Sequence, residues 1–177
     1  KYLNSFLETN PYSEIAWHQL GKQYVKDKMY EEALSAFDFA IISDDSFVGA
    51  YIEMAKILEK LNRINEAIEK YEISIGINQP TTFALYRIGR CHYKLGNNDL
   101  ALSYFIQTIE EDPIHDKAWM SIAVIYYNKN DFNESKNNLL KALEIDSDKI
   151  KYWELYAKIS VKIDDFEEVG NNVFAEE

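Results

Sequence analysis

The sequence is poor in the residues that build tight turns, disulfides and thiolate metal sites. Its 177 residues include six glycines, three prolines and one cysteine. So few glycines and prolines do not fit the many turns of a sandwich, a barrel or a doubly wound sheet, and they favour long helices joined by short connections. The single cysteine, Cys91, has no second cysteine with which to form an internal disulfide. We therefore expect an all-α fold.

Long apolar runs and a net positive charge are also missing. No segment approaches the roughly 18 apolar residues of a membrane span, and the segment from Lys1 onward shows no signal-peptide pattern. Thirty acidic against 19 basic residues give a formal net charge of −11, which disfavours nucleic acid and membranes as partners unless the basic residues are segregated. The compartment stays open, with the cytoplasm favoured. Because the first residue is not Met, we expect a fragment or a processed form.

Residue patterns of enzymes, nucleotide sites and metal sites are absent. The sequence has no G-x-x-x-x-G-K-[ST], no G-x-G-x-x-G and no H-E-x-x-H. The three histidines, His18, His92 and His115, fall in different predicted elements and are not expected to share a metal. Cys91 and His92 are neighbours on a predicted helix, so their side chains point about 100° apart and cannot form a catalytic pair. We expect no catalytic residues, no cofactor and no metal, and hence no enzyme.

The main feature that is present is an internal repeat with a period of 34 residues. One position of each repeat carries a small residue: Gly21, Ala55, Gly89, Ala123 and Ala157. Four residues earlier each repeat has a large residue: Trp17, Tyr51, Leu85, Trp119 and Trp153. Small residues opposite large ones let helix backbones approach closely, so each repeat is predicted to be a pair of antiparallel helices, A and then B. We expect the five large residues to be largely buried.

The clearest repeat identifies a family. Residues 14–47 contain the pattern W-x2-L-G-x2-Y, spelled by Trp17, Leu20, Gly21 and Tyr24, and followed by Ala33, Phe37 and Ala40. This pattern resembles the tetratricopeptide repeat. The resemblance implies a right-handed superhelical solenoid of antiparallel helix pairs, whose concave face is lined by the A helices. It also implies a role in protein contacts.

The uninterrupted register sets the predicted boundaries of a single array over residues 1–177. Residues 1–13 are interpreted as helix B of a truncated repeat and a turn. Full repeats follow at 14–47, 48–81, 82–115 and 116–149, and a divergent repeat at 150–177 ends the array. The turn between helices A and B carries Lys28, Asn62, Gly96, Asn130 or Asp164, mostly residues that tolerate a left-handed backbone or cap a helix. In the last repeat, helix B is expected to start at Asp165.

The resemblance also implies which residues face the groove. In this family, positions 2, 5, 6, 9, 12 and 13 of each helix A line it. Over five repeats these 30 positions hold 11 of the 19 basic residues and three of the 30 acidic ones. A chain that is acidic overall is therefore predicted to have a basic groove. The candidate peptide-binding residues are Lys22, Lys56, Phe83, Tyr86, Arg87, Arg90, Tyr93, Lys117, Met120, Tyr127 and Lys158.

Two simpler explanations compete with a binding role. Cations near helix C-termini are favoured by the helix dipole by roughly 0.3 to 1 kcal/mol, which accounts for Lys26, Lys60, Lys94 and Lys162 without a ligand. The aromatic residues can pack between helices instead of forming pockets. A column of cations at one position on four A helices remains, and it favours an anionic partner: Lys22, Lys56, Arg90 and Lys158.

Two specialised binding patterns of relatives are missing. The carboxylate clamp that holds chaperone C-termini would need Lys, Asn, Asn, Lys and Arg at positions that here carry His18, Lys22, Glu53, Phe83 and Arg87. Only the final Arg matches. The asparagine ladder of sugar-transferase relatives is absent as well.

The sequence thus predicts a non-enzymatic protein–protein interaction module that binds an acidic peptide segment in a basic, aromatic-containing concave groove. The alternative is a structural spacer or self-association segment of a longer repeat array. A third class, RNA binding, has the basic groove in its favour and the acidic exterior against it.

Overall fold

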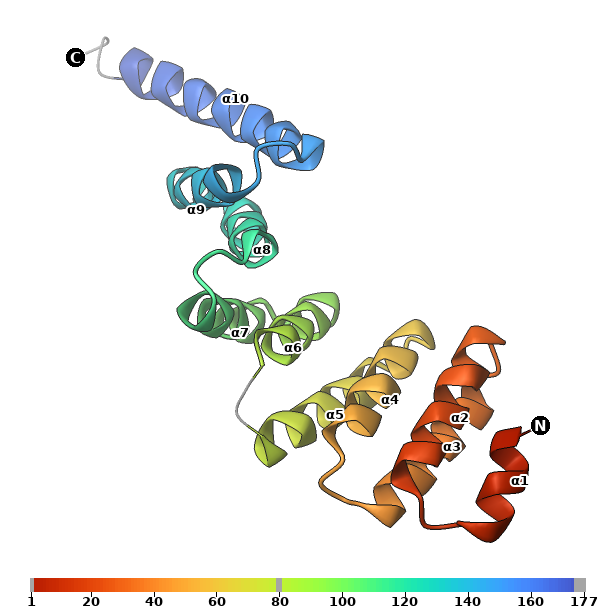
Figure 1. Ribbon diagram of the computed structural model, residues 1–177. Coiled ribbons are helices and arrows are strands. Elements are labelled where there is room, and N and C mark those ends of the chain that lie inside the picture. The colour runs from red at the N-terminus through yellow and green to blue at the C-terminus, as the bar shows by residue number, and fades with distance from the viewer. Residues whose placement is uncertain (1, 79–80, 174–177) are drawn as a thin grey trace. The chain divides into compact units, whose positions relative to one another are not determined.

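The computed structural model describes the backbone of residues 2–78 and 81–173 and the side chains of residues 5–78 and 81–164. Every regular element in these ranges is a helix (Figure 1), which confirms the predicted all-α fold. The helices are α1 (Tyr2–Thr9), α2 (Glu14–Lys26), α3 (Tyr30–Ser43), α4 (Val48–Lys60), α5 (Ile64–Ile77), α6 (Thr82–Lys94), α7 (Asn98–Glu111), α8 (Asp116–Asn128), α9 (Phe132–Ile145) and α10 (Ile150–Val173). Within the described ranges, no helix has the length and apolar content of a membrane span.

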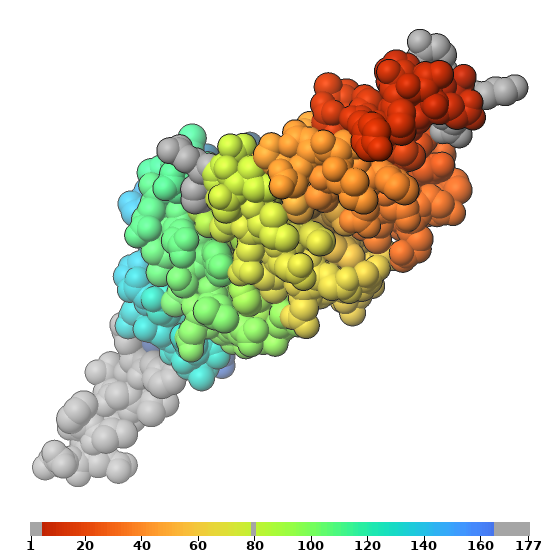
Figure 2. Space-filling view, turned by 90° about the horizontal axis from the view of Figure 1, so that it is seen from below, coloured from red at the N-terminus to blue at the C-terminus, as the bar shows by residue number. Residues whose placement is uncertain are grey.

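The chain divides into two compact units, Lys1–Gly96 and Asn97–Glu177. In the N-terminal unit, α2 with α3 and α4 with α5 form antiparallel pairs, and α6 packs on α5. Successive helices of this unit cover adjacent stretches of its surface in chain order (Figure 2). In the C-terminal unit, α8 and α9 form an antiparallel pair, with α7 against α8 and α10 against α9. The single array over residues 1–177 stays a prediction.

Small and large residues meet inside the helix pairs as the 34-residue register predicts. Phe37 of α3 is fully buried, and its ring lies so close to Gly21 of α2 that a Cβ atom there would be 2.7 Å from it. In the next pair, Ala55 and Tyr71 are both fully buried. Ala123 of α8 is buried likewise, and its carbonyl accepts a hydrogen bond from the Ser135 hydroxyl of α9 at 2.7 Å. Close backbone approach thus holds each pair together.

Four of the five predicted turn residues have the left-handed backbone that the sequence indicated. Lys28, Asn62 and Asn130 have φ values of 60°, 59° and 62°, and Gly96 has 79°. In the pairs α2–α3, α4–α5 and α8–α9, this left-handed conformation ends helix A and reverses the chain into helix B. The fifth turn, expected at Asp164, is absent because α10 continues to Val173. The prediction that a separate helix B starts at Asp165 is therefore wrong.

The expected burial holds for two of the five large residues. Tyr51 and Leu85 are buried, whereas Trp17 and Trp119 are half-buried. Trp153 is 50% exposed and Ala157 is exposed too, which corrects the prediction for the last repeat. The reason is the unbroken α10, which does not turn back over them within residues 150–173.

The three tryptophans share a contact that their spacing did not reveal. Each indole N–H donates a 2.8 Å hydrogen bond to the carbonyl six residues earlier, in the turn before its helix. The pairs are Trp17 with Pro11, Trp119 with Pro113, and Trp153 with Ser147. The tryptophan therefore fixes the turn that leads into helix A, and this role does not require a fully buried ring.

Candidate peptide-binding surface

The predicted binding residues of the N-terminal unit lie on α2, α4 and α6, and we call them the A-helix surface: Lys22, Lys56, Phe83, Tyr86, Arg87, Arg90 and Tyr93. Phe83 and Tyr93 are exposed, at 40% and 37%, and Tyr86 is half-buried. Two of these three aromatic side chains are therefore accessible to a ligand, and the third is only partly accessible. Phe83 and Tyr93 offer apolar area to a ligand, and Tyr86 offers less.

Phe83 is the point where two of the predicted cations meet. The Lys56 ammonium of α4 lies 5.2 Å from the ring centroid, and the Arg87 guanidinium of α6 lies 5.9 Å from it. Cations at such distances are attracted to the negative face of the ring. Lys56 also donates a 2.9 Å hydrogen bond to Glu53 of its own helix. The Phe83 ring thus contacts cations from two neighbouring helices of the surface.

Glu59 of α4 is the residue that sequence reasoning missed. Its side chain is buried, and its Oε1 atom lies 2.7 Å from Arg87 Nε and accepts a 2.9 Å hydrogen bond from the Tyr71 hydroxyl. Burial, with Glu59 as a second cause, raises the pKa of Tyr71 well above its usual range. The available signal was that Glu59 is one of only three acidic residues among the groove positions.

The Glu59 contact changes what Arg87 can do. Its charge is already compensated by a buried carboxylate, so Arg87 joins α4 to α6 and cannot be counted as a free cation of the surface. Among the side chains that the structure describes, no carboxylate directly compensates two cations of the surface: Lys22, which is exposed, and Arg90, which lies 5.9 Å from the Tyr86 ring centroid. These two are the better candidates for contacting an acidic ligand.

His18 lies beside this surface, packed between two phenylalanines. Its ring centroid is 5.4 Å from that of Phe37 and 5.1 Å from that of Phe47. Burial lowers the pKa of His18, and the nearby Lys22 lowers it further. The imidazole is therefore a neutral packing group at physiological pH. Among the residues that the structure describes, no three His, Cys, Asp or Glu side chains are placed to hold a metal ion.

In the C-terminal unit, the predicted binding residues are Lys117, Met120, Tyr127 and Lys158. Both lysines are exposed. Met120 and Tyr127 are half-buried against the hydrophobic core of α8, α9 and α10, and the Tyr127 ring lies 5.5 Å from that of Phe132. Packing therefore occupies much of these two side chains, as the simpler explanation of the groove aromatics expected.

Antiparallel helix pairs that repeat every 34 residues define a class of helical repeat proteins that contact other proteins. Models of the tetratricopeptide repeat match residues 48–80 and 92–159 of this chain. The chain belongs to the tetratricopeptide repeat family and is a protein–protein interaction module of that family. Proteins of this family are typically non-enzymatic scaffolds.

Two similar proteins are subunits of one assembly. The chain is 27% identical over 145 residues to anaphase-promoting complex subunit CDC16 of Saccharomyces cerevisiae, covering 80% of this chain and 17% of that protein. It is 28% identical over 144 residues to anaphase-promoting complex subunit 3 of Schizosaccharomyces pombe, covering 79% and 21%. The chain thus spans about a fifth of the length of these relatives.

A solved structure supports the fold. YrrB, described as a TPR protein with an unusual peptide-binding site, superposes with a TM-score of 0.77 at 18% identity, covering 93% of this chain and 84% of that one. At 18% identity, this similarity is evidence for a shared fold alone.

Proposed function

We propose that this chain is a non-enzymatic module that binds an acidic peptide segment of a protein partner through the A-helix surface. The observation that carries the proposal is the exposed aromatic area of Phe83 and Tyr93 on a surface that also carries the exposed Lys22 and the half-buried Arg90. Lys22 and Arg90 add charge that no carboxylate compensates directly. The relatives named as anaphase-promoting complex subunits support a role inside a multiprotein assembly.

Charge pairs and apolar contacts are expected to contribute unequally to the binding free energy of the peptide. An exposed ion pair is worth about 0.2 to 1 kcal/mol, so Lys22 and Arg90 together supply at most about 2 kcal/mol. Micromolar affinity needs about 8 kcal/mol, so most of it must come from buried apolar and aromatic contacts. Phe83 and Tyr93, the two exposed aromatic residues of the surface, are the proposed source. In the C-terminal unit, Lys117 and Lys158 are the proposed contacts for an acidic segment, with smaller parts for Met120 and Tyr127.

The test is a binding titration with a fluorescent acidic peptide that contains one aromatic residue. Binding is expected to weaken between about 50 mM and about 500 mM salt, because screening weakens exposed charge pairs. Lys22→Glu with Arg90→Glu is expected to slow association, and Phe83→Ala to speed dissociation. Lys28→Glu, an exposed cation in the turn between α2 and α3, is the matched control. Unchanged binding of the double variant at low salt would show that the acidic segment does not use this surface.

The same titration tests the alternative role as a spacer or self-association segment. Association of the chain with itself by apolar stacking is not weakened by salt. Sedimentation that shows a concentration-dependent dimer, persisting at high salt, together with no binding of acidic peptides, favours that role.

A further inference from the structure

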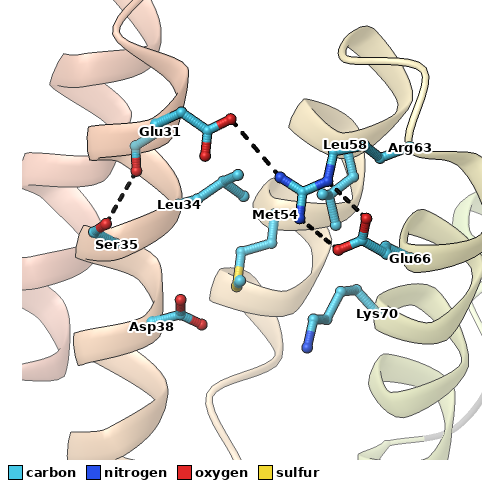
Figure 3. A pocket seen from close by; sticks show the side chains of 9 residues that line it. All are labelled: Glu31, Leu34, Ser35, Asp38, Met54, Leu58, Arg63, Glu66 and Lys70. Atoms are coloured by element: carbon cyan, nitrogen blue, oxygen red, sulfur yellow. Dashed lines mark hydrogen bonds and ion pairs between the residues drawn. The ribbon is translucent and has the colours of Figure 1, made fainter.

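The B-helix side of the N-terminal unit has a hollow of about 260 Å³ that the proposed function does not use (Figure 3). Its walls come from α3 and α5, and α4 contributes to its floor. The lining residues are Glu31, Leu34, Ser35, Asp38, Met54, Leu58, Arg63, Glu66 and Lys70.

The floor of the hollow is apolar. Leu34, Met54 and Leu58 are 7%, 4% and 2% exposed, and their side chains form its base. An apolar floor under polar walls is the usual construction of a ligand site, because the floor supplies affinity and the walls supply orientation. The hollow therefore fits one apolar side chain of a partner.

One end of the hollow is closed by ion pairs. Arg63 Nε donates a 2.7 Å hydrogen bond to Glu66, its Nη2 lies 2.5 Å from the same carboxylate, and its Nη1 lies 3.7 Å from Glu31 (Figure 3). The charge of Arg63 is thus compensated within the protein. It fixes the rim but leaves no cation to attract a ligand.

At the other end, Asp38 is an incompletely compensated carboxylate. Burial raises the pKa of Asp38, and the nearby Lys70 only partly opposes this shift. No direct ion pair joins the two side chains in the described structure, and Lys70 lies 3.9 Å from Glu69 instead. Asp38 is thus a solvent-accessible carboxylate at the edge of the hollow that forms no ion pair with the described side chains.

The two helices that form the walls of the hollow carry a net negative charge, like Asp38 itself. Helices α3 and α5 together have six acidic residues and one lysine. A second hollow of about 220 Å³ shares Ser35 and Asp38 with the first and is bordered by Phe39 and Ile42, which are 47% and 73% exposed. Acidic charge, an apolar floor and an adjoining apolar stretch lie along one side of α3.

We propose that this hollow is a second docking site, which takes a partner peptide carrying Lys or Arg next to an apolar side chain. The apolar side chain lies on Leu34, Met54 and Leu58, and the cation pairs with Asp38. The preference is opposite in charge to that of the A-helix surface, so the two sites can hold two different segments at once. The site does not depend on the proposed function.

The test is a nuclear magnetic resonance titration of the whole chain with an acetylated Gly-Ser-Leu-Lys-Gly-Ser amide peptide. The expected result is saturable shifts of the Ser35, Asp38 and Lys70 amides. Asp38→Asn is expected to weaken binding about tenfold, as for the loss of a charge-assisted hydrogen bond. The matched control is Glu32→Gln, an exposed acid on the same helix outside the hollow, which should leave the dissociation constant within about twofold. A second peptide, with Glu in place of Lys, is expected to bind the wild-type chain at least about tenfold more weakly than the Lys peptide does. Its loss of affinity should therefore equal or exceed that caused by Asp38→Asn.

Four outcomes would overturn the proposal, the first three of which concern the hollow itself. These three are no saturable shifts at α3 and α5, equal losses in Asp38→Asn and Glu32→Gln, and equal binding of the Lys and Glu peptides. Shifts confined to α2 and α6 would also overturn it, because they would place the peptide on the A-helix surface. Binding of acidic peptides to the A-helix surface is measured separately, so failure of either site leaves the other standing.

Discussion

Arg87 on α6 directs Nε and Nη2 at a single carboxylate oxygen of Glu59 on α4, at 2.7 and 2.5 Å. Because Glu59 is buried, removing Arg87 leaves a largely desolvated carboxylate with only the Tyr71 hydroxyl and the more distant Lys94 as partners. We predict that Arg87→Met lowers the free energy of unfolding of the N-terminal unit by about 2 to 3 kcal/mol. Urea denaturation followed by circular dichroism measures it. Lys94→Met is the control, since Lys94 lies farther from Glu59, at 3.8 Å, and is more exposed. If both variants lose the same free energy of unfolding, the contact between Arg87 and Glu59 stabilises the unit no more than the Lys94 contact does.

Gly21 and Gly76 receive the same substitution with opposite expected results. A Cβ at Gly21 would lie 2.7 Å from the buried Phe37 ring, whereas a Cβ at Gly76 would meet nothing within 4 Å. Gly21→Ala is predicted to destabilise the protein by about 1 to 3 kcal/mol through overpacking. Gly76→Ala is predicted to stabilise it by up to about 1 kcal/mol through helix propensity. Thermal unfolding of both variants measures the effects, and a melting temperature raised in both would contradict the packing of Phe37 on Gly21.

Asp116 makes the C-terminal unit sensitive to acid. Burial acts to raise the pKa of Asp116, but hydrogen bonds from Lys149 and from the Tyr152 hydroxyl, the latter at 2.5 Å, hold it below the usual range. A lowered pKa contributes stability that is present above the unfolded-state value and is lost as the pH falls through the folded-state value. We predict that wild type exceeds Asp116→Asn in stability by about 1 kcal/mol at pH 7 and that the gap closes as the pH falls through the lowered pKa of Asp116.

Urea titrations of both proteins at several pH values test this expectation. Asp99→Asn is the control, because Asp99 is fully exposed in its ion pair with Lys129 and should give a smaller gap. A gap for Asp116→Asn that stays constant with pH would contradict the prediction.

Asp38 is expected to behave in the opposite way. Burial raises the pKa of Asp38, so its ionisation costs stability at neutral pH, and the folded state gains stability as the pH falls through the raised value. Asp38→Asn is therefore predicted to raise the melting temperature at pH 7 and to lose that advantage in acid. Glu32→Gln serves as the comparison in differential scanning calorimetry. A lower melting temperature for Asp38→Asn would mean that the attraction of Lys70 outweighs burial.

Cys91 is predicted to be unreactive in the folded protein. The side chain is fully buried, and burial, with Glu59 as a second cause, raises the pKa of the thiol to about 11. The thiolate is the reactive form, so labelling by a disulfide reagent at about pH 8 should accelerate by about two orders of magnitude or more when urea unfolds the chain. Labelling of the native protein at the rate of a free thiol would contradict this burial.

The repeat register accounts for most of what the sequence predicted correctly. Helices begin at Glu14, Val48, Thr82, Asp116 and Ile150, the residues at which the 34-residue period starts each repeat. Left-handed turns were found where Lys, Asn and Gly were expected to end helix A. These features are local: helical spacing and turn chemistry depend on residues within a few positions of one another.

The last repeat shows where that local information ends. Trp153 and Ala157 occupy the right positions, yet they are exposed because α10 runs through Asp164 without a turn. Asp164 is a weaker candidate than Asn or Gly for the left-handed conformation that ends helix A. The residue pattern also contains no information on whether a separate helix B would gain enough packing contacts to fold back on helix A.

By itself, the sequence determined the helical class, the period and the side of each helix that carries cations. The tertiary structure alone decided which of those cations are free. Arg87 is bound to a carboxylate 28 residues away and Arg63 to one three residues away, while Lys22 and Arg90 form no ion pair with the side chains that the structure describes. It also decided that Asp38 of α3 borders a hollow whose apolar floor is completed by Met54 and Leu58 of α4. The physical reason is that the net charge of a surface depends on distances of a few ångströms between side chains of different helices, and these distances follow from packing rather than from residue spacing.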